Sequence, residues 1–503
     1  MKKGWTILVL CALLLTTVAM LGSCHGGKTP DSTTDSGGGS NSTSATDEWG
    51  RPMLHSPLDE SLFYSGETMT VISRDTWNSA AQFEPNDLDS DIMYSAVQKR
   101  NEMIYQRLGV EIRNIPVAGG DYNAQLNQRI RTQVSGGNCE FDMIANFAYY
   151  GSALAMEGYY YDLNRLQNIY TDQAWWNQDY IEQSVIGNKM YMAVNDACLV
   201  SLRYTFVTFF QKPLVNAWLN GVNLYSVVDS NEWTVEYFDR LVKDVYSDVN
   251  GSDRDEKDLY GLVTSSSAQN IDSFFAGMGL KTCTLNDVGT PELSLNNDLT
   301  LSGFELISDL YFNNNGVFVT GSGNDDYRKA TEIFSENRSL FSVGQLDNGS
   351  TFLNSMAAGS FGILPMPKMD ESDSYSTTAQ DAYDFLALPS TLPNQRLEMA
   401  GAVMEYMAYA SYLTVKPSYF ETVTKLRYST EADDARMFDI ISENIYFDFG
   451  MIYSSSIMGV GTHLGHFWRS LFQNQTTGFI TEYRKSESAY EKQLGIVIDM
   501  LME

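Results

Sequence analysis

Aromatic and planar polar side chains follow several apolar runs of the chain, where they could bind a flat ligand with a polar rim. An aromatic face packs on apolar C–H surface, while carboxylate and amide groups form hydrogen bonds with hydroxyls. The chain holds 30 Tyr, 25 Phe and 8 Trp, and any surplus beyond the core suits such a ligand. The candidate ligand-binding residues are Asp75, Trp77, Asn146, Tyr149, Tyr150, Asp196, Tyr204, Gln269, Asn270, Gln345 and Asp347. For Trp77 and for many of the Tyr and Phe residues, the alternative interpretation is that the side chain packs in the hydrophobic core.

Signatures of metal, nucleotide and acyl-transfer chemistry are missing from the sequence. His463 and His466 would share a helix face, but no third ligand or H-E-x-x-H context accompanies them. The glycine-rich run at 459–465 is one residue too long for a dinucleotide fingerprint, and no P-loop or G-x-S-x-G motif occurs. We therefore predict no metal, no cofactor and no enzymatic activity. The many carboxylates leave a glycosidase pair open as an alternative.

The N-terminus has the order of a secretory signal. Lys2 and Lys3 precede an uncharged apolar run at 5–20, and Leu21 to Cys24 resembles the lipobox of bacterial lipoproteins. The resemblance implies cleavage before Cys24 and a diacylglycerol on its sulfur. A membrane span is the alternative, but the apolar run is short against the roughly 20 residues needed to cross a bilayer. We predict that residues 1–24 are a lipoprotein signal peptide and that the protein is lipid-anchored on the outer face of the cell membrane, extracellular or periplasmic.

Three cysteines remain beyond the lipobox: Cys139, Cys198 and Cys283. Export would permit one disulfide, whereas buried free thiols are the simpler interpretation, and the spacing does not match a zinc site.

Residues 25–48 are rich in Ser, Thr, Gly and Asn and should form a disordered tether with a reach of about 25–30 Å. The formal net charge of the chain is −30, which argues against nucleic acid and against anionic lipid headgroups as partners. We therefore expect the lipid anchor alone to hold the protein at the membrane. The remaining chain of about 455 residues exceeds what one core usually supports, so two domains are expected.

Strands alternate with helices in the first part of the folded chain. We expect strands at 68–73, 110–115 and 141–145, and helices at 91–108, stopped by Gly109, and at 121–134. This alternation predicts an α/β fold with a parallel sheet, in which ligands bind at the carboxyl ends of the strands. Farther along, we expect a hairpin at 185–194, strands at 201–210, 259–264, 339–343, 361–365 and 385–389, and helices at 234–246, 299–312, 397–412 and 468–472, followed by a terminal amphipathic helix.

The order of several short motifs over residues 67–503 resembles the family 1 extracellular solute-binding proteins, which are the sugar receptors of ABC importers. The matching stretches are Phe141–Ala145 with Tyr161-Asp162-Leu163, Trp175-Trp176 with Ile186–Tyr191, Glu232–Phe238, Phe361–Pro367, and Ala402–Met407 with Lys416–Tyr419. The resemblance also implies that Trp175 and Trp176 pack in the core.

The family fold is a two-lobe, type II periplasmic-binding-protein-like α/β fold with hinge crossings. The resemblance places crossings near Ser201, Leu364 and Leu426. Lobe one would hold residues 49–200 and 365–425, and lobe two 201–364 and 426–503. The implied function is a monomeric receptor that delivers a mono- or oligosaccharide to the membrane subunits of an ABC importer.

The resemblance adds Trp468 to the candidate ligand-binding residues, because in the family a similar Phe-Trp helix start supplies a tryptophan that stacks on a sugar ring. The adjacent Arg469 would then point off that face. The alternative is a core tryptophan packed under the last helix.

Two other classes of carbohydrate-active protein remain as alternatives: a glycosidase lipoprotein and a surface lipoprotein that gathers starch without transporting it. Proteins of the second class are mostly helical repeats, and this sequence shows no internal repeat of 20–50 residues. Within the receptor class, a peptide, a polyol or a uronate is an alternative ligand.

Overall fold

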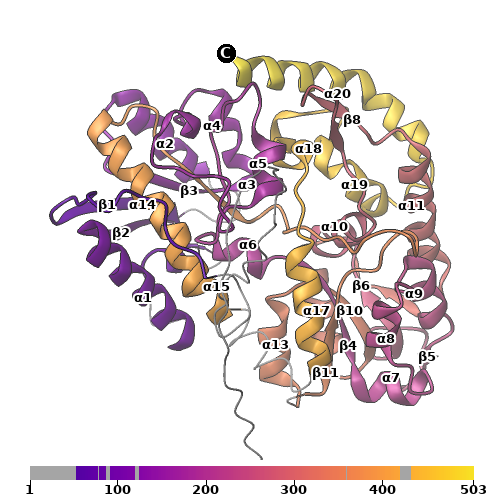
Figure 1. Cartoon of the computed structure of the whole chain (residues 1–503). Coiled ribbons are helices and arrows are strands. Elements are labelled where there is room, and N and C mark those ends of the chain that lie inside the picture. Colours follow the sequence, from indigo (N-terminus) through magenta and orange to yellow (C-terminus); the bar gives the residue numbers. More distant parts are fainter. Residues whose placement is uncertain (1–52, 77–78, 86–90, 119–123, 358, 420–431) are drawn as a thin grey trace, which may run out of the picture. The chain divides into compact units, whose positions relative to one another are not determined.

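A computed structural model describes residues 53–76, 79–85, 91–118, 124–357, 359–419 and 432–503 (Figure 1). Cys24, the tether and Trp77 lie outside the described residues. The chain from Ser56 to Glu503 forms one compact unit. Within the described part of the chain, no helix combines the length and the apolar character needed to cross a membrane.

The first sheet has the strand order β12-β3-β1-β2. Its parallel strands are β1 (Glu67–Arg74), β2 (Val110–Val117) and β3 (Met143–Phe147), and β12 (Asp384–Ala387) joins antiparallel to β3. All five residues of β3 are buried, as expected for a strand that is covered on both faces. The helices of this part are α1 (Asp91–Leu108), α2 (Ala124–Gly136), α3 (Ala148–Gly151), α4 (Ala153–Met156), α5 (Gln178–Ser184), α14 (Asn394–Leu413) and α15 (Val415–Pro417).

The second sheet has the order β11-β4-β10-β6-β5, and β9 also pairs with β6. Its strands are β4 (Phe206–Gln211), β5 (Tyr246–Ser247), β6 (Leu259–Thr264), β9 (Val317–Val319), β10 (Ser339–Gln345) and β11 (Phe361–Leu364). Helices α10 (Ala268–Gly277) and α12 (Asn324–Ser335) both contact β10. The surrounding helices are α7 (Lys212–Trp218), α8 (Leu224–Asp229), α9 (Val235–Val242), α11 (Asp298–Ser308) and α13 (Asn348–Ser355), and β7 (Cys283–Leu285) pairs with β8 (Pro291–Leu293).

The chain passes between the sheets through short segments. Helix α6 (Leu199–Arg203) leads into β4, and residues 365–383 connect β11 to β12. The last part of the chain holds α17 (Ala432–Glu443), α18 (Phe449–Ile452), α19 (Phe467–Gln473) and α20 (Phe479–Met502). The strands of the first sheet all fall in the segments predicted for lobe one, and those of the second sheet in 201–364. The lobe boundaries themselves stay a prediction, and the predicted crossing near Leu426 lies outside the described residues.

Helix α20 contacts elements that surround the first sheet and elements that surround the second. It packs on β8 and α11, and its C-terminal end reaches α4, as Figure 1 also shows. The Lys189 ammonium donates a hydrogen bond of 2.8 Å to the carbonyl of Met502.

One apolar cluster, which we call the crossing core, joins α1 to the second sheet beside the crossing. Its main members are Met93, Val97, Val207, Phe209, Phe334, Phe352, Phe361, Ile363, Val415 and Phe438. Phe352 is central, with ring centroids 4.7 Å from Phe334 and 4.9 Å from Phe209.

Most predicted elements are confirmed, and those at 91–108 and 259–264 have the predicted bounds. Gly109 follows α1 with φ +68°, the left-handed conformation that ends a helix most easily at glycine. The predicted strand at 201–210 is wrong in its first half. There the Ser201 hydroxyl bonds the carbonyl of Cys198, a local bond that favours a helical turn over a strand.

Two further predictions were imprecise at their ends. The helix capped by Thr234 stops at Val242 rather than 246, because Asp244 turns the chain with φ +62°. The hairpin at 185–194 is a turn through Gly187 and Asn188 with the single bridge Ile186–Lys189.

All three described cysteines are free thiols. Burial raises the pKa of Cys198 to about 12 and the pKa of Cys283 well above its usual range.

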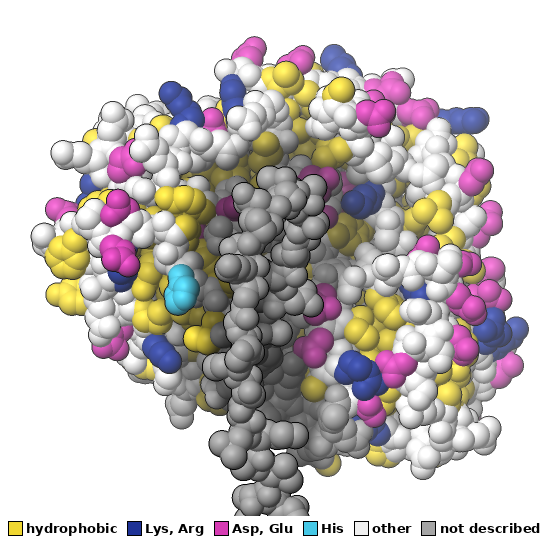
Figure 2. Space-filling model, viewed as in Figure 1, with side chains coloured by type: hydrophobic (Ala, Val, Ile, Leu, Met, Phe, Trp, Pro, Cys, Tyr) yellow, Lys and Arg dark blue, Asp and Glu magenta, His cyan; other side chains and the backbone are white. Residues whose placement is uncertain are grey.

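Acidic side chains are spread over the face of the molecule in Figure 2, with Lys and Arg interspersed among them. The negative net charge is therefore not gathered into one block on this face.

Candidate ligand-binding cleft

A cleft of about 630 Å³ lies at the carboxyl ends of strands from both sheets. Phe147, Tyr149 and Tyr150 come from the end of β3, and Gln345 and Asp347 from the end of β10. Between these two groups lie Gln380, Asp381 and Ala382 of the segment that joins the sheets. The remaining lining residues are Tyr204, Ala268, Gln269, Asn324, Tyr327, Arg328, His463, His466 and Arg469.

Tyr149 and His466 form a stacked pair that links β3 to the last part of the chain. Their ring centroids are 4.4 Å apart with an interplanar angle of 15°, and the Tyr149 hydroxyl lies 3.4 Å from His466 Nδ1. Tyr150 meets the edge of Tyr149 with centroids 4.4 Å apart. The amide N–H of Tyr149 donates to the carbonyl of Asp381 at 3.3 Å. The backbone therefore fixes this aromatic wall against the crossing segment.

A chain of polar side chains runs along the floor of the cleft. Gln345 Nε2 donates to Gln380 Oε1 at 2.9 Å, and Gln380 Nε2 donates to Asp381 Oδ1 at 2.9 Å. Arg469 and His466 reach Asp381 Oδ2 at 3.0 and 3.2 Å. Each amide is thus held in one orientation, which fixes the donors and acceptors that a ligand meets.

Asp381 is the anionic centre of this floor. Burial opposes its ionisation, but Arg469 and His466 hold the pKa of Asp381 well below its usual range. Burial, with the nearby Arg469 charge, lowers the pKa of His466 to about 4, so its ring is neutral at neutral pH. Arg469 also forms an ion pair with Asp272 of α10, and burial raises the pKa of Asp272 to about 6 despite that pair.

A second ion pair fixes the side of the cleft formed by the end of β10. Arg203 at the end of α6 contacts Asp347 Oδ1 at 2.8 Å, and the Asp347 amide N–H donates to the Arg203 carbonyl at 2.9 Å. Tyr327 accepts a hydrogen bond of 2.5 Å from Asn348 Nδ2. These contacts hold the first crossing and the start of α13 together.

The cleft brings together six residues that the sequence predicted as ligand-binding: Tyr149, Tyr150, Tyr204, Gln269, Gln345 and Asp347. Their side chains come from elements far apart in the chain. The prediction that they contact ligand is not tested by this placement.

The structure places three other predicted residues in structural hydrogen-bond networks. Asn146 is fully buried inside β3, and its amide donates to Asn127 and Tyr160 at 2.9 Å. Asn270 is buried on α10, where its Oδ1 accepts from the Ser265 amide N–H. Asp196 forms an ion pair of 3.0 Å with Lys416 in a separate pocket.

Asp75 is exposed and does not line the described cleft. The neighbouring Arg74 turns inward instead and pairs with Asp384 at 3.1 Å.

Trp468 lies in an aromatic cluster outside the cleft. It is 2% exposed, with ring centroids 5.1 Å from Phe275 and 5.4 Å from Phe472. The structure therefore places it in the core, as the alternative interpretation had it. The expectation that Arg469 points away from the cleft is wrong, because its guanidinium reaches Asp381 on the cleft floor.

Trp175 and Trp176 are buried as predicted, and both indole N–H groups donate to the carboxylate of Glu405, at 2.8 and 3.0 Å. Burial raises the pKa of Glu405 to about 7. These residues support the first sheet from behind and do not line the cleft.

Sequence reasoning missed Gln380, Asp381, His466 and Arg469. In the sequence, His466 stands out only through its spacing from His463, which suggests metal binding and not a place in a ligand cleft. Gln380 and Asp381 lie on the connection between β11 and β12. The only signal in the sequence that could have pointed to them is that this connection is a hydrophilic run between two apolar strands.

Comparisons with known proteins identify the fold. No protein-family model matches the chain, and no curated protein matches its sequence. Among solved structures, the GacH receptor of Streptomyces glaucescens, described unliganded and with acarbose, has a TM-score of 0.52 at 12% identity, covering 88% of this chain and 100% of that one. A cyclo/maltodextrin-binding protein complexed with maltotetraose has a TM-score of 0.52 at 13% identity over 87% and 98%.

UgpB from Mycobacterium tuberculosis in complex with glycerophosphocholine also has a TM-score of 0.52, at 13% identity over 87% of this chain and 100% of that one. The predicted fold, two-lobe and type II periplasmic-binding-protein-like, is therefore confirmed. The neighbours are binding proteins, in agreement with the family resemblance of the sequence.

Proposed function

We propose that the protein is a lipid-anchored extracellular receptor that binds a neutral carbohydrate and delivers it to an ABC importer. The observation that carries this proposal is the lining of the cleft, where tyrosine rings lie together with amide side chains, two of which, Gln345 and Gln380, are held in one orientation by hydrogen bonds. Tyr149, Tyr150, Tyr204 and Tyr327 supply the rings, and Gln269, Gln345, Gln380 and Asn324 supply the amides. Rings of this kind pack on sugar C–H faces, and amides bond sugar hydroxyls.

The charged side chains of the cleft favour a neutral ligand. Asp347 is paired with Arg203, Asp381 with Arg469, and Arg328 with Asp325. Among the described lining residues, each charge thus has an opposite charge within its own network. A charged ligand that displaced the arginine partner of Asp347 or Asp381 would leave that carboxylate uncompensated, at a cost in desolvation. The Arg328–Asp325 pair is exposed and contributes little to this argument.

A glycosidase gains no support from the carboxylates of the cleft. Such an enzyme needs one carboxylic acid that holds its proton near neutral pH. The two lining carboxylates, Asp347 and Asp381, both face arginines, and the pKa of Asp381 is held low. Asp272, whose pKa is raised, lies behind Arg469 and does not line the cleft.

A thermal-shift panel tests the ligand class. Neutral mono- and oligosaccharides are compared with galacturonate and glycerophosphocholine, each with the purified soluble chain. A ligand at 100 times its Kd adds about 2.7 kcal/mol of stability, which raises the melting temperature measurably. Stabilisation by a neutral sugar supports the proposal, and stabilisation by the charged solutes alone overturns it.

The lipid anchor is tested separately. The order Leu21-Gly22-Ser23-Cys24 supports lipidation, and we expect metabolic labelling with a palmitate analogue in the wild type and none in Cys24→Ala. Equal labelling of both proteins would overturn this part of the proposal.

A further inference from the structure

One short segment of the chain bonds to both halves of the receptor. It runs from Tyr446 to Tyr453, and we call it the clasp. We call the half that contains the first sheet the first side, and the half that contains the second sheet the second side. The Tyr446 amide N–H donates to the carbonyl of Thr377 at 2.9 Å, on the connection between β11 and β12. The clasp therefore begins beside a segment that crosses between the two sides.

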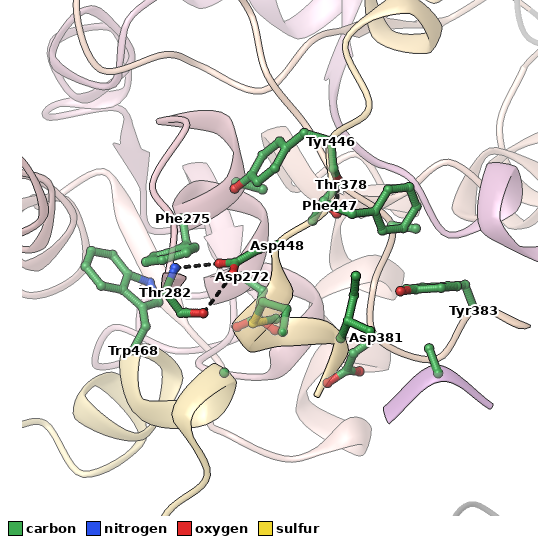
Figure 3. Close-up of a pocket in the computed structure, with 16 residues that line it drawn as sticks. Asp272, Phe275, Thr282, Thr378, Asp381, Tyr383, Tyr446, Phe447, Asp448 and Trp468 are labelled. Atoms are coloured by element: carbon green, nitrogen blue, oxygen red, sulfur yellow. Dashed lines mark hydrogen bonds between the residues drawn. The ribbon is translucent and has the colours of Figure 1, made fainter. Parts of the chain in front are cut away.

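Two residues of the clasp bond to the second side, at the chain segment that follows α10. The Tyr446 hydroxyl donates to the carbonyl of Leu280 at 2.7 Å. The Asp448 carboxylate accepts from the Thr282 hydroxyl at 3.0 Å and from the Cys283 amide N–H at 3.2 Å. Figure 3 draws the bonds between Asp448 and Thr282. Because Asp448 is buried, water does not replace these bonds in the folded protein.

The residue between these two bonds to the first side instead. The Phe447 amide N–H donates to the Asp179 carboxylate at the start of α5. The Phe447 ring packs on the rings of Tyr180 and Tyr383, with centroids 5.1 Å apart in both pairs. Figure 3 shows the rings of Tyr446 and Phe447 pointing in opposite directions. Neighbouring residues of the clasp are therefore anchored on different sides.

Two contacts farther along the chain also reach the first side. The Tyr453 hydroxyl donates to the carbonyl of Ser184, at the end of α5, at 3.4 Å. At the end of the chain, Met502 lies beside Gly187, and its carbonyl accepts from the Lys189 ammonium at 2.8 Å. Helix α20, which carries Met502, also packs on β8 and α11 of the second side. The two sides are thus joined at the clasp and again through α20.

The clasp can follow only one side when the two sides rotate apart. Periplasmic binding proteins open and close around their ligands by such a rotation at a hinge. In this protein, an opening rotation must break either the bonds of Tyr446 and Asp448 or the contacts of Phe447 and Tyr453. Breaking hydrogen bonds and separating packed rings both cost free energy. The clasp therefore opposes opening whichever side it follows.

We propose that the clasp holds the two sides of the ligand-free receptor in a single arrangement, so that the cleft is already formed before the ligand arrives. A cleft formed in advance binds its ligand without the cost of a conformational change. The inference follows from contacts within the fold and does not depend on which ligand the cleft binds.

Double electron–electron resonance on the ligand-free protein tests the inference. Spin labels at Gln128→Cys on α2 and Glu332→Cys on α12 report the distance across the cleft, because both residues are exposed and lie on opposite sides. The soluble chain that begins after Cys24 also carries Cys139→Ser, since Cys139 is partly exposed while the other two described thiols are buried. We expect one narrow distribution of distances for this reference chain.

A loosened clasp should allow the two sides to separate. Asp179→Ala combined with Tyr453→Phe leaves the Phe447 amide N–H without its acceptor unless the two sides move apart. We expect the equilibrium constant for the open arrangement to rise about tenfold, seen as a second population at longer distance. Tyr446→Phe removes only the hydroxyl that bonds to Leu280, and should give the same change to a smaller extent.

The matched control removes bonds of the same kinds within the first side. Asp162 accepts from the Met190 amide N–H at 3.0 Å, and the Tyr160 hydroxyl donates to the carbonyl of Gly151 at 3.0 Å. Asp162→Ala combined with Tyr160→Phe should therefore keep the single distribution of the reference chain. Melting curves verify that the variants are folded.

The distance distributions decide the inference. A second population in the loosened chains, with none in the control, supports it. Two populations in the reference chain, identical distributions in the reference and loosened chains, or the same second population in the control would each overturn it. None of these measurements uses a sugar, so their outcome leaves the proposed function to be judged by the thermal-shift panel.

Discussion

The crossing core and the cleft are both built where the two sheets meet, but different forces hold them. In the crossing core, Phe209, Phe334 and Phe352 are fully buried and pack against other rings and aliphatic side chains. In the cleft, Gln380 and Asp381 are positioned by hydrogen bonds and by the Arg469 ion pair. The crossing core therefore depends on close packing of apolar side chains, and the cleft on the geometry of hydrogen bonds and ion pairs. We expect substitutions in the crossing core to lower the stability of the fold, and substitutions in the cleft to lower the affinity for ligand.

The largest effect is expected in the crossing core. Phe352→Ala removes a ring with no exposed surface, and we expect a loss of about 3–5 kcal/mol in the free energy of unfolding. Urea denaturation measures this loss. Sugar affinity of the remaining folded protein should stay within about twofold of the wild type, and a selective loss of affinity with full stability would reverse the roles of the two regions.

Arg469 forms ion pairs with Asp381 on the cleft floor and with Asp272 of α10. Arg469→Met leaves Asp381 and Asp272 without their buried partner, so we expect a loss of about 3 kcal/mol in stability at pH 7. The deficit should shrink as the pH is lowered through the pKa of Asp272, about 6 in the wild type, because a protonated carboxyl no longer needs the cation. A deficit that does not change with pH would show that Arg469 acts through packing alone.

Glu405 provides a pH-dependent comparison behind the first sheet. Its pKa in the folded protein is about 7, above its ordinary value of 4.5, so the folded state binds the proton more tightly. The corresponding stability is fully present below pH 4.5 and is lost as the pH rises through 7, by about 3 kcal/mol. Glu405→Gln should remove this slope from a plot of unfolding free energy against pH. If the slope of unfolding free energy against pH is the same in Glu405→Gln as in the wild type, another group causes the pH dependence.

The smallest effect on stability is expected on the cleft floor. Gln380→Ala removes the link between Gln345 and Asp381, and we expect a change of about 1 kcal/mol or less in unfolding free energy. Sugar affinity should fall by about tenfold, because two amide orientations are no longer fixed. Calorimetry and urea denaturation on the same preparation measure both quantities, and an unchanged affinity would remove Gln380 from the site.

The sequence predicted the first sheet well, because strong helical spacing and the stop at Gly109 locate α1 and its flanking strands. The rule that ligands meet the ends of strands also selected Tyr149, Gln345 and Asp347, which the structure places in the cleft lining. The same rule placed Asn146 after the third strand, but β3 extends to Phe147, two residues beyond the predicted end, so Asn146 lies within the strand.

Two other features depended on tertiary geometry. Successive residues of a helix point about 100° apart. The sequence does not fix which side of α19 faces the cleft, and the prediction chose Trp468 where the structure places the neighbouring Arg469. Asp381 gains its role only when α19 is brought against the crossing segment. No local pattern in the sequence records that contact.

A crystal structure with the most stabilising neutral sugar tests the central claim most directly. We predict the sugar in the cleft, with hydroxyls within hydrogen-bond distance of Gln345 and Gln380 and a ring face on one of the lining tyrosines. A sugar bound elsewhere, with the cleft holding only solvent, would contradict the account.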